Sequence, residues 1–171
     1  DKAETDTAQA MAVNTHSVSV LAEFAQSAGA CLVHYSTDYV FDGSGTQPWA
    51  EDDAVAPMSV YGQTKYLGEQ AIVKTCQKHL VLRTSWVVGA HGGNFLKTML
   101  RLAAERESLR VVADQVGAPT STQLLADITV ALLRAMQGAK ADDVRWGVYH
   151  LAPEGETTWH GYAQHVVAGA L

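Results

Sequence analysis

The sequence has no long hydrophobic run and no dense cluster of basic residues, and each absence excludes a class of protein. Without an apolar stretch of about 20 residues, it offers no candidate transmembrane helix, and no secretory signal opens it. A net charge of −6 without a Lys/Arg cluster argues against a nucleic-acid-binding surface. We therefore expect a cytoplasmic protein with neither a membrane nor a nucleic-acid partner.

Cysteine is scarce, and no side chains show the spacing of metal ligands. Cys31 and Cys76 lie in apolar stretches, which predicts reduced, packed thiols. The seven histidines form no H-x-x-x-H pair and have no cysteine partner. We interpret the histidines as surface or satisfied core residues.

Alternating helix and strand patterns fill the first half of the chain. A helix is expected over residues 5–28, with Asp6 as N-cap and an apolar stripe formed by Val18, Leu21, Ala22 and Ala25. Short apolar runs at 30–36 and 79–89 predict strands, and a helix over about 61–78 separates them. Strand, helix, strand is the βαβ signature, so the sheet should be parallel.

After Gly89 the pattern changes to shorter elements. We expect an amphipathic helix near 92–108, a short strand within 109–120, and a helix opened by a capping box from Thr120 to Gln123. A strand at 147–152 and a final helix follow. The predicted fold class is α/β: part of a Rossmann-like, doubly wound parallel sheet in residues 1–89, followed by a smaller α/β lobe in residues 90–171.

Tyr61 and Lys65 lie four residues apart on the second predicted helix, so their side chains share one face. A tyrosine pKa of about 10 is high for proton transfer at neutral pH, and a nearby ammonium would lower it. Gly68, on the same face, would leave room for a large ligand. The alternative is a pair of ordinary half-exposed helix residues.

Ser36, Thr37 and Asp38 follow the first buried strand, at the sheet edge where open α/β folds bind ligands. A hydroxyl there could hold a carbonyl oxygen beside Tyr61. Such a run also forms ordinary turns and helix caps. The order strand, Ser-Thr-Asp, loop, Tyr-x-x-x-Lys helix, strand favours a reaction site.

Five stretches together resemble the extended short-chain dehydrogenase/reductase family, and within it the dTDP-4-dehydrorhamnose reductases. They are STDYVFDG, YGQTKYLGE, RTSWVVG with GGNFLKTMLRLA, DQVGAPTS, and GVYHLAPEGETTWHGYA. The resemblance covers nearly the whole chain in order. It implies NADPH- or NADH-dependent reduction of the 4-keto group of dTDP-4-dehydro-L-rhamnose to dTDP-L-rhamnose, an activated sugar for bacterial surface polysaccharide.

The resemblance also implies roles for individual residues. Tyr61 would protonate the C-4 oxygen, while Lys65 would hold the nicotinamide ribose and lower the pKa of Tyr61. Thr37 would bind the same oxygen, and Asp38 and Trp86 would contact the sugar. Asn14 occupies the position of a helix asparagine that supports a water relay to the lysine. Arg83 could bind substrate or serve as a structural ion-pair partner.

Departures from the family pattern limit these expectations. The chain has no G-x-x-G-x-x-G turn after a strand to receive the cofactor pyrophosphate, so we expect a fragment that lacks this N-terminal region and the C-terminus. Some members of the family bind magnesium through acidic residues. This sequence does not support a magnesium site, because the neutral Gln123 lies in a region where those members often have an acid. The choice between NADPH and NADH and the presence of a homodimer stay open.

Two alternatives remain. One is a nucleotide-sugar epimerase or dehydratase on the same scaffold, although a dehydratase needs an Asp-Glu pair where this chain has Asp38 followed by Tyr39. The other is a non-catalytic, regulatory homologue that binds a dinucleotide. Retention of Thr37, Tyr61 and Lys65 together argues against the second.

Overall fold

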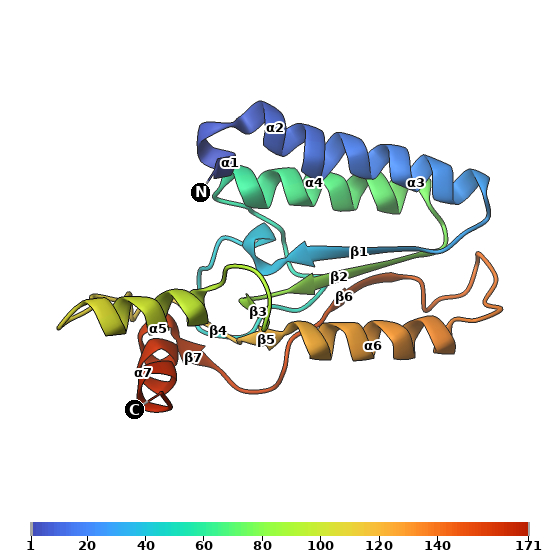
Figure 1. Ribbon diagram of the computed structural model, residues 1–171. Coiled ribbons are helices and arrows are strands. Elements are labelled where there is room, and N and C mark those ends of the chain that lie inside the picture. The colour runs from blue at the N-terminus through green and yellow to red at the C-terminus, as the bar shows by residue number, and fades with distance from the viewer. Residues whose placement is uncertain (1, 171) are drawn as a thin grey trace. The chain divides into compact units, whose positions relative to one another are not determined.

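The computed structural model describes residues 2–170, which form two compact units (Figure 1). The first unit contains the chain up to Thr84 together with Met136–Leu151, and the second contains Ser85–Ala135 and the residues from Ala152 onward. This division differs from the expected boundary at residue 89. Residues 136–151 join the first unit because their strand pairs with a strand of that unit.

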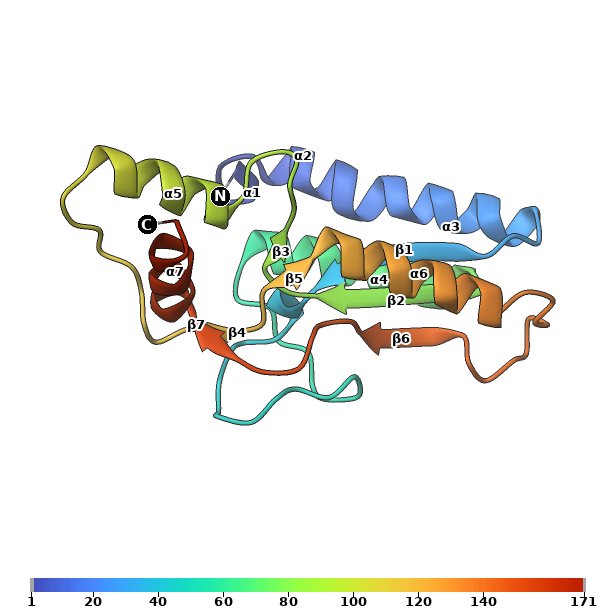
Figure 2. The same cartoon turned by 60° about the horizontal axis from the view of Figure 1, so that its bottom comes forward.

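A three-stranded parallel sheet forms the centre of the first unit, as the sequence predicted (Figure 2). Its order is β1 (Leu32–Thr37), β2 (His79–Thr84) and β6 (Gly147–His150). Leu32 pairs with His79 and Thr37 with Thr84, so the first two strands end together at their carboxyl ends. The strand expected over 79–89 stops at Thr84, because Trp86 adopts a φ of 44° that breaks the extended backbone.

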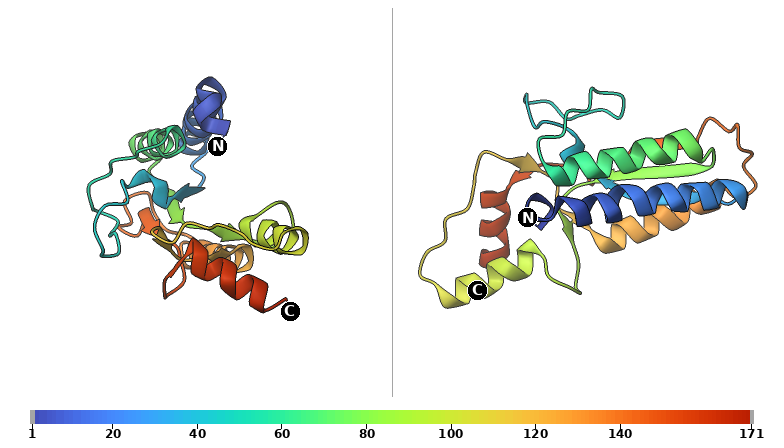
Figure 3. Two further views of the ribbon diagram at one scale, coloured as in Figure 1. Left: turned by 90° about the vertical axis from the view of Figure 1, so that its left-hand side faces the viewer. Right: turned by 90° about the horizontal axis from the view of Figure 1, so that it is seen from above.

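Helices cover one face of this sheet. They are α1 (Lys2–Thr5), α2 (Thr7–Met11), the π-helical segment η1 (Ala12–His16), α3 (Ser17–Ser27) and α4 (Val60–Thr75). Asp6 caps α2 as predicted, since its carboxylate accepts a hydrogen bond from the Gln9 amide. Figure 3 shows α3 and α4 running side by side.

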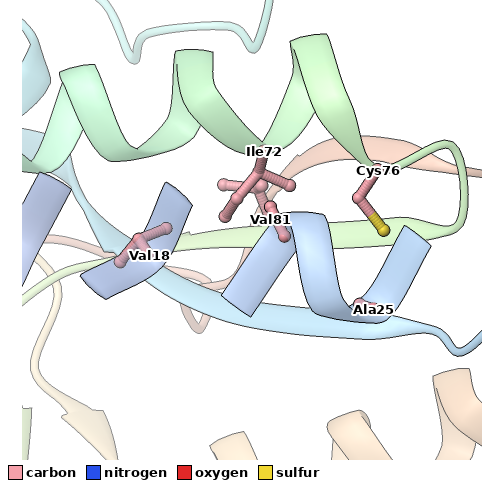
Figure 4. Packing of buried hydrophobic residues seen from close by; sticks show 6 residues of the cluster. Val18, Ala25, Ile72, Cys76 and Val81 are labelled. Atoms are coloured by element: carbon pink, nitrogen blue, oxygen red, sulfur yellow. The ribbon is translucent and has the colours of Figure 1, made fainter. Parts of the chain in front are cut away.

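The core of the first unit lies where α3 and α4 meet the sheet (Figure 4). Its buried members are Val18, Ala22, Ala25, Ile72, Cys76 and Val81. One residue of the predicted apolar stripe was assigned wrongly: Leu21 is 54% exposed. Small residues at the other stripe positions let α3 approach α4 closely, and Leu21 lies outside that contact.

Gly68 serves this helix contact, and the prediction that it would leave room for a ligand is wrong. A Cβ atom at Gly68 would lie 2.3 Å from the backbone oxygen of Asn14 in η1. The space beside Gly68 is therefore filled by the neighbouring helix backbone. Only glycine permits α4 to pack so closely against η1.

Gly68→Ala should destabilise the protein by about 1–3 kcal/mol, because backbone atoms must shift to admit the methyl group. Urea unfolding measures the change. Gly93→Ala is the matched control, since a Cβ atom there would meet nothing within 4 Å. Equal stability of the two variants would contradict the packing role of Gly68.

The second unit is built from short strand pairs and three helices. Strand β3 (Val87–Val88) pairs in parallel with β5 (Thr120–Ser121), and β4 (Val116–Gly117) pairs antiparallel with β7 (Thr157–Thr158). The helices are α5 (Phe95–Glu105), α6 (Thr122–Ala135) and α7 (Trp159–Ala168). The strand expected within 109–120 is reduced to the two short pieces β4 and β5.

The predicted capping box at the start of α6 is also wrong. Ser121 caps the helix by accepting a hydrogen bond from the Leu124 amide. Thr120 is fully buried and donates its hydroxyl proton to the Ala118 carbonyl. Gln123 donates to Asp127 one turn further along. The pairing of β5 with β3 holds Thr120 in a strand, which shifts the cap by one residue.

Candidate active site

The candidate site in the first unit begins at the carboxyl end of β1. Thr37 is the last residue of that strand, and Asp38 opens the short 3₁₀ turn η2 (Asp38–Val40). The Thr37 hydroxyl donates to the Asp38 carboxylate at 3.1 Å and accepts from the Tyr39 amide at 3.2 Å. Thr37 therefore caps the turn, as Ser-Thr-Asp runs commonly do, and its buried hydroxyl also stands at the ligand-binding edge of the sheet.

Tyr61 reaches this strand end from the first turn of α4. The Tyr61 side chain lies near Thr37, whose hydroxyl acts on the pKa of Tyr61, and the Tyr61 ring meets the Tyr39 ring edge-on at 6.0 Å. Burial raises the pKa of Tyr61, the Thr37 hydroxyl opposes that rise, and Asp38 adds to it. A phenol in this setting keeps its proton at neutral pH, which suits a proton donor.

Lys65 does not act on Tyr61 in this structure in the way the sequence predicted. Its Nζ donates to the Tyr35 carbonyl at 2.6 Å and lies 3.1 Å from Nε2 of His34. Burial lowers the pKa of Lys65, and the negative charge of Glu69 partly offsets this by raising it. The groups that shift the pKa of Tyr61 do not include Lys65, so that pKa is raised where we expected it to be lowered.

His34 is a residue of this site that the sequence did not single out. Burial and the adjacent Lys65 ammonium lower the pKa of His34 to about 4. Its imidazole is thus neutral at neutral pH, and Nε2 accepts a hydrogen bond from Lys65 when Nδ1 carries the ring hydrogen. Lys65 lies 31 residues away in sequence, so no local spacing could have indicated the pair.

The pKa of His34 predicts a loss of stability in mild acid. In the unfolded chain His34 takes up a proton at about pH 6.5, whereas in the folded protein it stays neutral to about pH 4. The unfolded state binds more protons in this window, so the free energy of unfolding should fall as pH drops from about 6.5 to 4. Denaturation measured across this range for the wild type and His34→Gln isolates the effect, because the glutamine variant should show a flatter dependence.

Glu4, on α1, is a second residue that the sequence did not single out. Its carboxylate accepts hydrogen bonds from the amides of Val60 at 2.9 Å and Tyr61 at 3.4 Å, at the positive end of α4. Ser59 completes the cap by accepting from the Gly62 amide. A hollow of about 490 Å³ is lined by Glu4, Tyr39, Ser59 and Tyr61. Glu4 and Ser59 therefore fix the first turn of α4, which carries Tyr61, and this turn borders the hollow.

Arg83 and Asn14 have structural partners. Arg83 is 6% exposed and pairs with the equally buried Glu69 at 2.7 Å. It also donates to the Glu51 carbonyl, and this set confirms the ion-pair interpretation of Arg83. The Asn14 amide donates to the Thr64 hydroxyl at 3.1 Å, which ties η1 to α4.

Trp86 lies in the second unit. Its ring stacks on Trp159 with a centroid distance of 3.6 Å, and Phe95 and Tyr162 extend the aromatic cluster around Trp159. Gly117 permits this arrangement, since a Cβ atom there would lie 2.6 Å from the Trp86 ring. Trp159 is thus a packing residue. The structure brings Thr37, Asp38 and Tyr61 together in one unit and assigns Trp86 to the other.

Within residues 2–170, no group of three His, Cys, Asp or Glu side chains is arranged to hold a metal ion. The same part of the chain contains no helix long and apolar enough to cross a membrane.

Comparison with known proteins identifies close relatives. The family described as RmlD substrate binding domain matches residues 1–170. The dTDP-4-dehydrorhamnose reductase of Escherichia coli K12 is 52% identical over 163 residues, covering 95% of this chain and 54% of that protein. The chain therefore spans about half the length of the curated relatives it matches.

Solved structures give the same result. The Bacillus anthracis dTDP-4-dehydrorhamnose reductase, solved in complex with NADP, is 37% identical with a TM-score of 0.86, covering 99% of this chain and 58% of that one. The Clostridium acetobutylicum reductase is also 37% identical, with a TM-score of 0.90 and coverage of 98% and 57%. The Rossmann-like α/β fold class predicted from the sequence is confirmed.

Proposed function

The chain belongs to the RmlD substrate-binding domain family, and from this premise we propose that its full-length protein reduces dTDP-4-dehydro-L-rhamnose to dTDP-L-rhamnose with NADPH or NADH. The observation that carries the proposal is the meeting of Tyr61 with the carboxyl end of β1, where its ring contacts Tyr39 in the turn that Thr37 caps. Relatives with the same reductase name and a neighbour solved with NADP support it. Such a reaction belongs in the cytoplasm.

The nicotinamide cofactor supplies a hydride to C-4 of the sugar when it is bound. Tyr61 donates its phenolic proton to the C-4 oxygen, so the carbonyl becomes an alcohol, and Tyr61 regains a proton from solvent. The Thr37 hydroxyl, which donates to Asp38 in this structure, would turn to donate to the same oxygen and orient it towards the phenol. Burial keeps Tyr61 protonated until the oxygen gains charge in the transition state.

Lys65 fits a role in holding the cofactor ribose. An ammonium has three N–H donors, and His34 and Tyr35 account for two of them. The third can donate to a ribose hydroxyl. Residues that receive the cofactor pyrophosphate would have to come from outside this chain, because it has no Gly-rich turn after a strand.

Asp38 and Trp86 are the proposed substrate contacts. The Asp38 carboxyl is largely buried, and this burial raises its pKa. Trp86 holds a positive φ of 44°, a strained conformation that is typical of functional sites when a non-glycine residue adopts it. Its indole can present a face or an N–H to the sugar.

A direct assay of the full-length protein tests this proposal. Incubation with dTDP-4-dehydro-L-rhamnose and either NADPH or NADH should oxidise the cofactor and yield dTDP-L-rhamnose, detected by absorbance and by proton NMR of the sugar. Turnover without net cofactor oxidation would favour an epimerase or dehydratase. Cofactor binding without turnover would favour the regulatory alternative. Light scattering of the same sample would show whether a homodimer forms.

A further inference from the structure

His34 and the Tyr35 carbonyl hold the Lys65 amine from two consecutive residues of β1. We propose that His34 is a positioning residue for Lys65: the His34 ring, 3.1 Å from the Lys65 amine, fixes that amine in the orientation that receives the cofactor ribose. The proposal rests on the proposed function, because the ribose contact of Lys65 is part of it. The contact between His34 and Lys65 can nevertheless be tested without any assay of turnover.

The geometry gives two fixed points to a flexible side chain. The His34 side chain meets Lys65 and so projects towards α4, while the Tyr35 carbonyl belongs to the backbone of the strand and lies in the plane of the sheet. The Lys65 side chain extends from α4, and its Nζ lies 3.1 Å from His34 Nε2 and 2.6 Å from the Tyr35 carbonyl oxygen. A lysine side chain has four rotatable bonds, and holding its end before the ligand arrives reduces the entropy lost on binding.

The electrostatic surroundings keep His34 able to accept a hydrogen bond. The charged groups that act on His34 and Lys65 both come from α4. Lys65 acts on His34, and Glu69, which is paired with Arg83 of β2, acts on Lys65. The residue opposite His34 on β2 is Val81, which is fully buried and apolar. Among the described residues, burial and Lys65 act on the pKa of His34, and both disfavour the imidazolium.

A pair of variants of the full-length protein tests the functional part. His34→Leu removes the acceptor with little change in volume, and kcat/KM for the cofactor should fall about tenfold, chiefly through a higher KM. His34→Gln keeps an acceptor oxygen within reach of the amine and should recover most of the loss. A purely structural role would not be rescued in this way, because both variants fill the same space. Unchanged or increased kcat/KM in His34→Leu would overturn the proposal.

Nitrogen NMR of the histidine-labelled protein tests the contact itself. The His34 signal, identified by its loss in His34→Gln, should show a neutral ring with the hydrogen on Nδ1 down to about pH 4. In Lys65→Met that pKa should rise only in part, because the neighbouring ammonium is gone while burial, the larger cause of the lowered pKa, remains. An ordinary pKa for His34 in the wild type would overturn the contact. A shifted pKa in a protein with no reductase activity would instead locate the failure in the proposed function.

Discussion

Tyr61→Phe in the full-length protein should lower kcat by about 10²–10⁴-fold while changing the KM for the nucleotide sugar little. The variant keeps the ring, its edge-on contact with Tyr39 and the first turn of α4, and loses only the phenolic hydroxyl. Because the proton donor acts in the transition state, its loss appears in turnover more than in binding. Steady-state kinetics with saturating cofactor measures both constants.

Tyr66→Phe is the matched control for this variant. Tyr66 lies on the same helix and is half-buried, yet it has no part in the site. It should keep kcat and KM close to wild type. If Tyr61→Phe also turned over at the wild-type rate, Tyr61 would not be the proton donor, and another group would have to supply the proton.

Arg83→Met should destabilise the protein by about 3–5 kcal/mol, since it leaves the Glu69 carboxylate buried without its partner. Arg83 and Glu69 are 6% and 2% exposed, and the guanidinium contacts both carboxylate oxygens. The guanidinium also bonds to the Glu51 carbonyl and lies over the Phe41 ring. The same change therefore releases the loop that follows β1. Denaturant unfolding measures the loss.

Two controls separate the buried charge from the size of the side chain. The double variant Arg83→Met with Glu69→Met removes both charges and should recover most of the stability. Arg101→Met breaks an exposed pair with Glu105 and should cost about 0.2–1 kcal/mol. A double variant as unstable as Arg83→Met would show that the contacts to Glu51 and Phe41 dominate.

Local patterns in the sequence predicted the fold of the first unit well. Buried apolar runs identified β1 and β2, and the helix between them required a parallel pairing. Asp6 indicated a helix start because its hydrogen bond closes within one turn. The strand break at Trp86 and the shifted cap at Ser121 were not predictable, since both depend on pairing between β3 and β5.

The candidate site was predictable only in its sequence-local parts. Ser-Thr-Asp after a strand and Tyr-x-x-x-Lys on a helix predicted the strand end and the helix turn that meet there. The partners of these residues depend on distant chain segments. Glu4 caps α4 across 56 residues, and His34 meets Lys65 across 31. Lys65 was expected to act on Tyr61, yet two acceptors on β1 hold it instead, and no spacing rule reveals that competition.

The return of β6 to the sheet makes the first unit discontinuous in sequence. Leu80 pairs with Gly147, so a recombinant fragment ending at residue 89 would leave one edge of β2 without its neighbouring strand. Neither unit can be expressed as a single uninterrupted segment. During synthesis on the ribosome, β2 can pair with β6 only after the intervening segment Ser85–Ala135 has been synthesised. The topology thus couples folding of the strand ends at the candidate site to synthesis of the neighbouring unit.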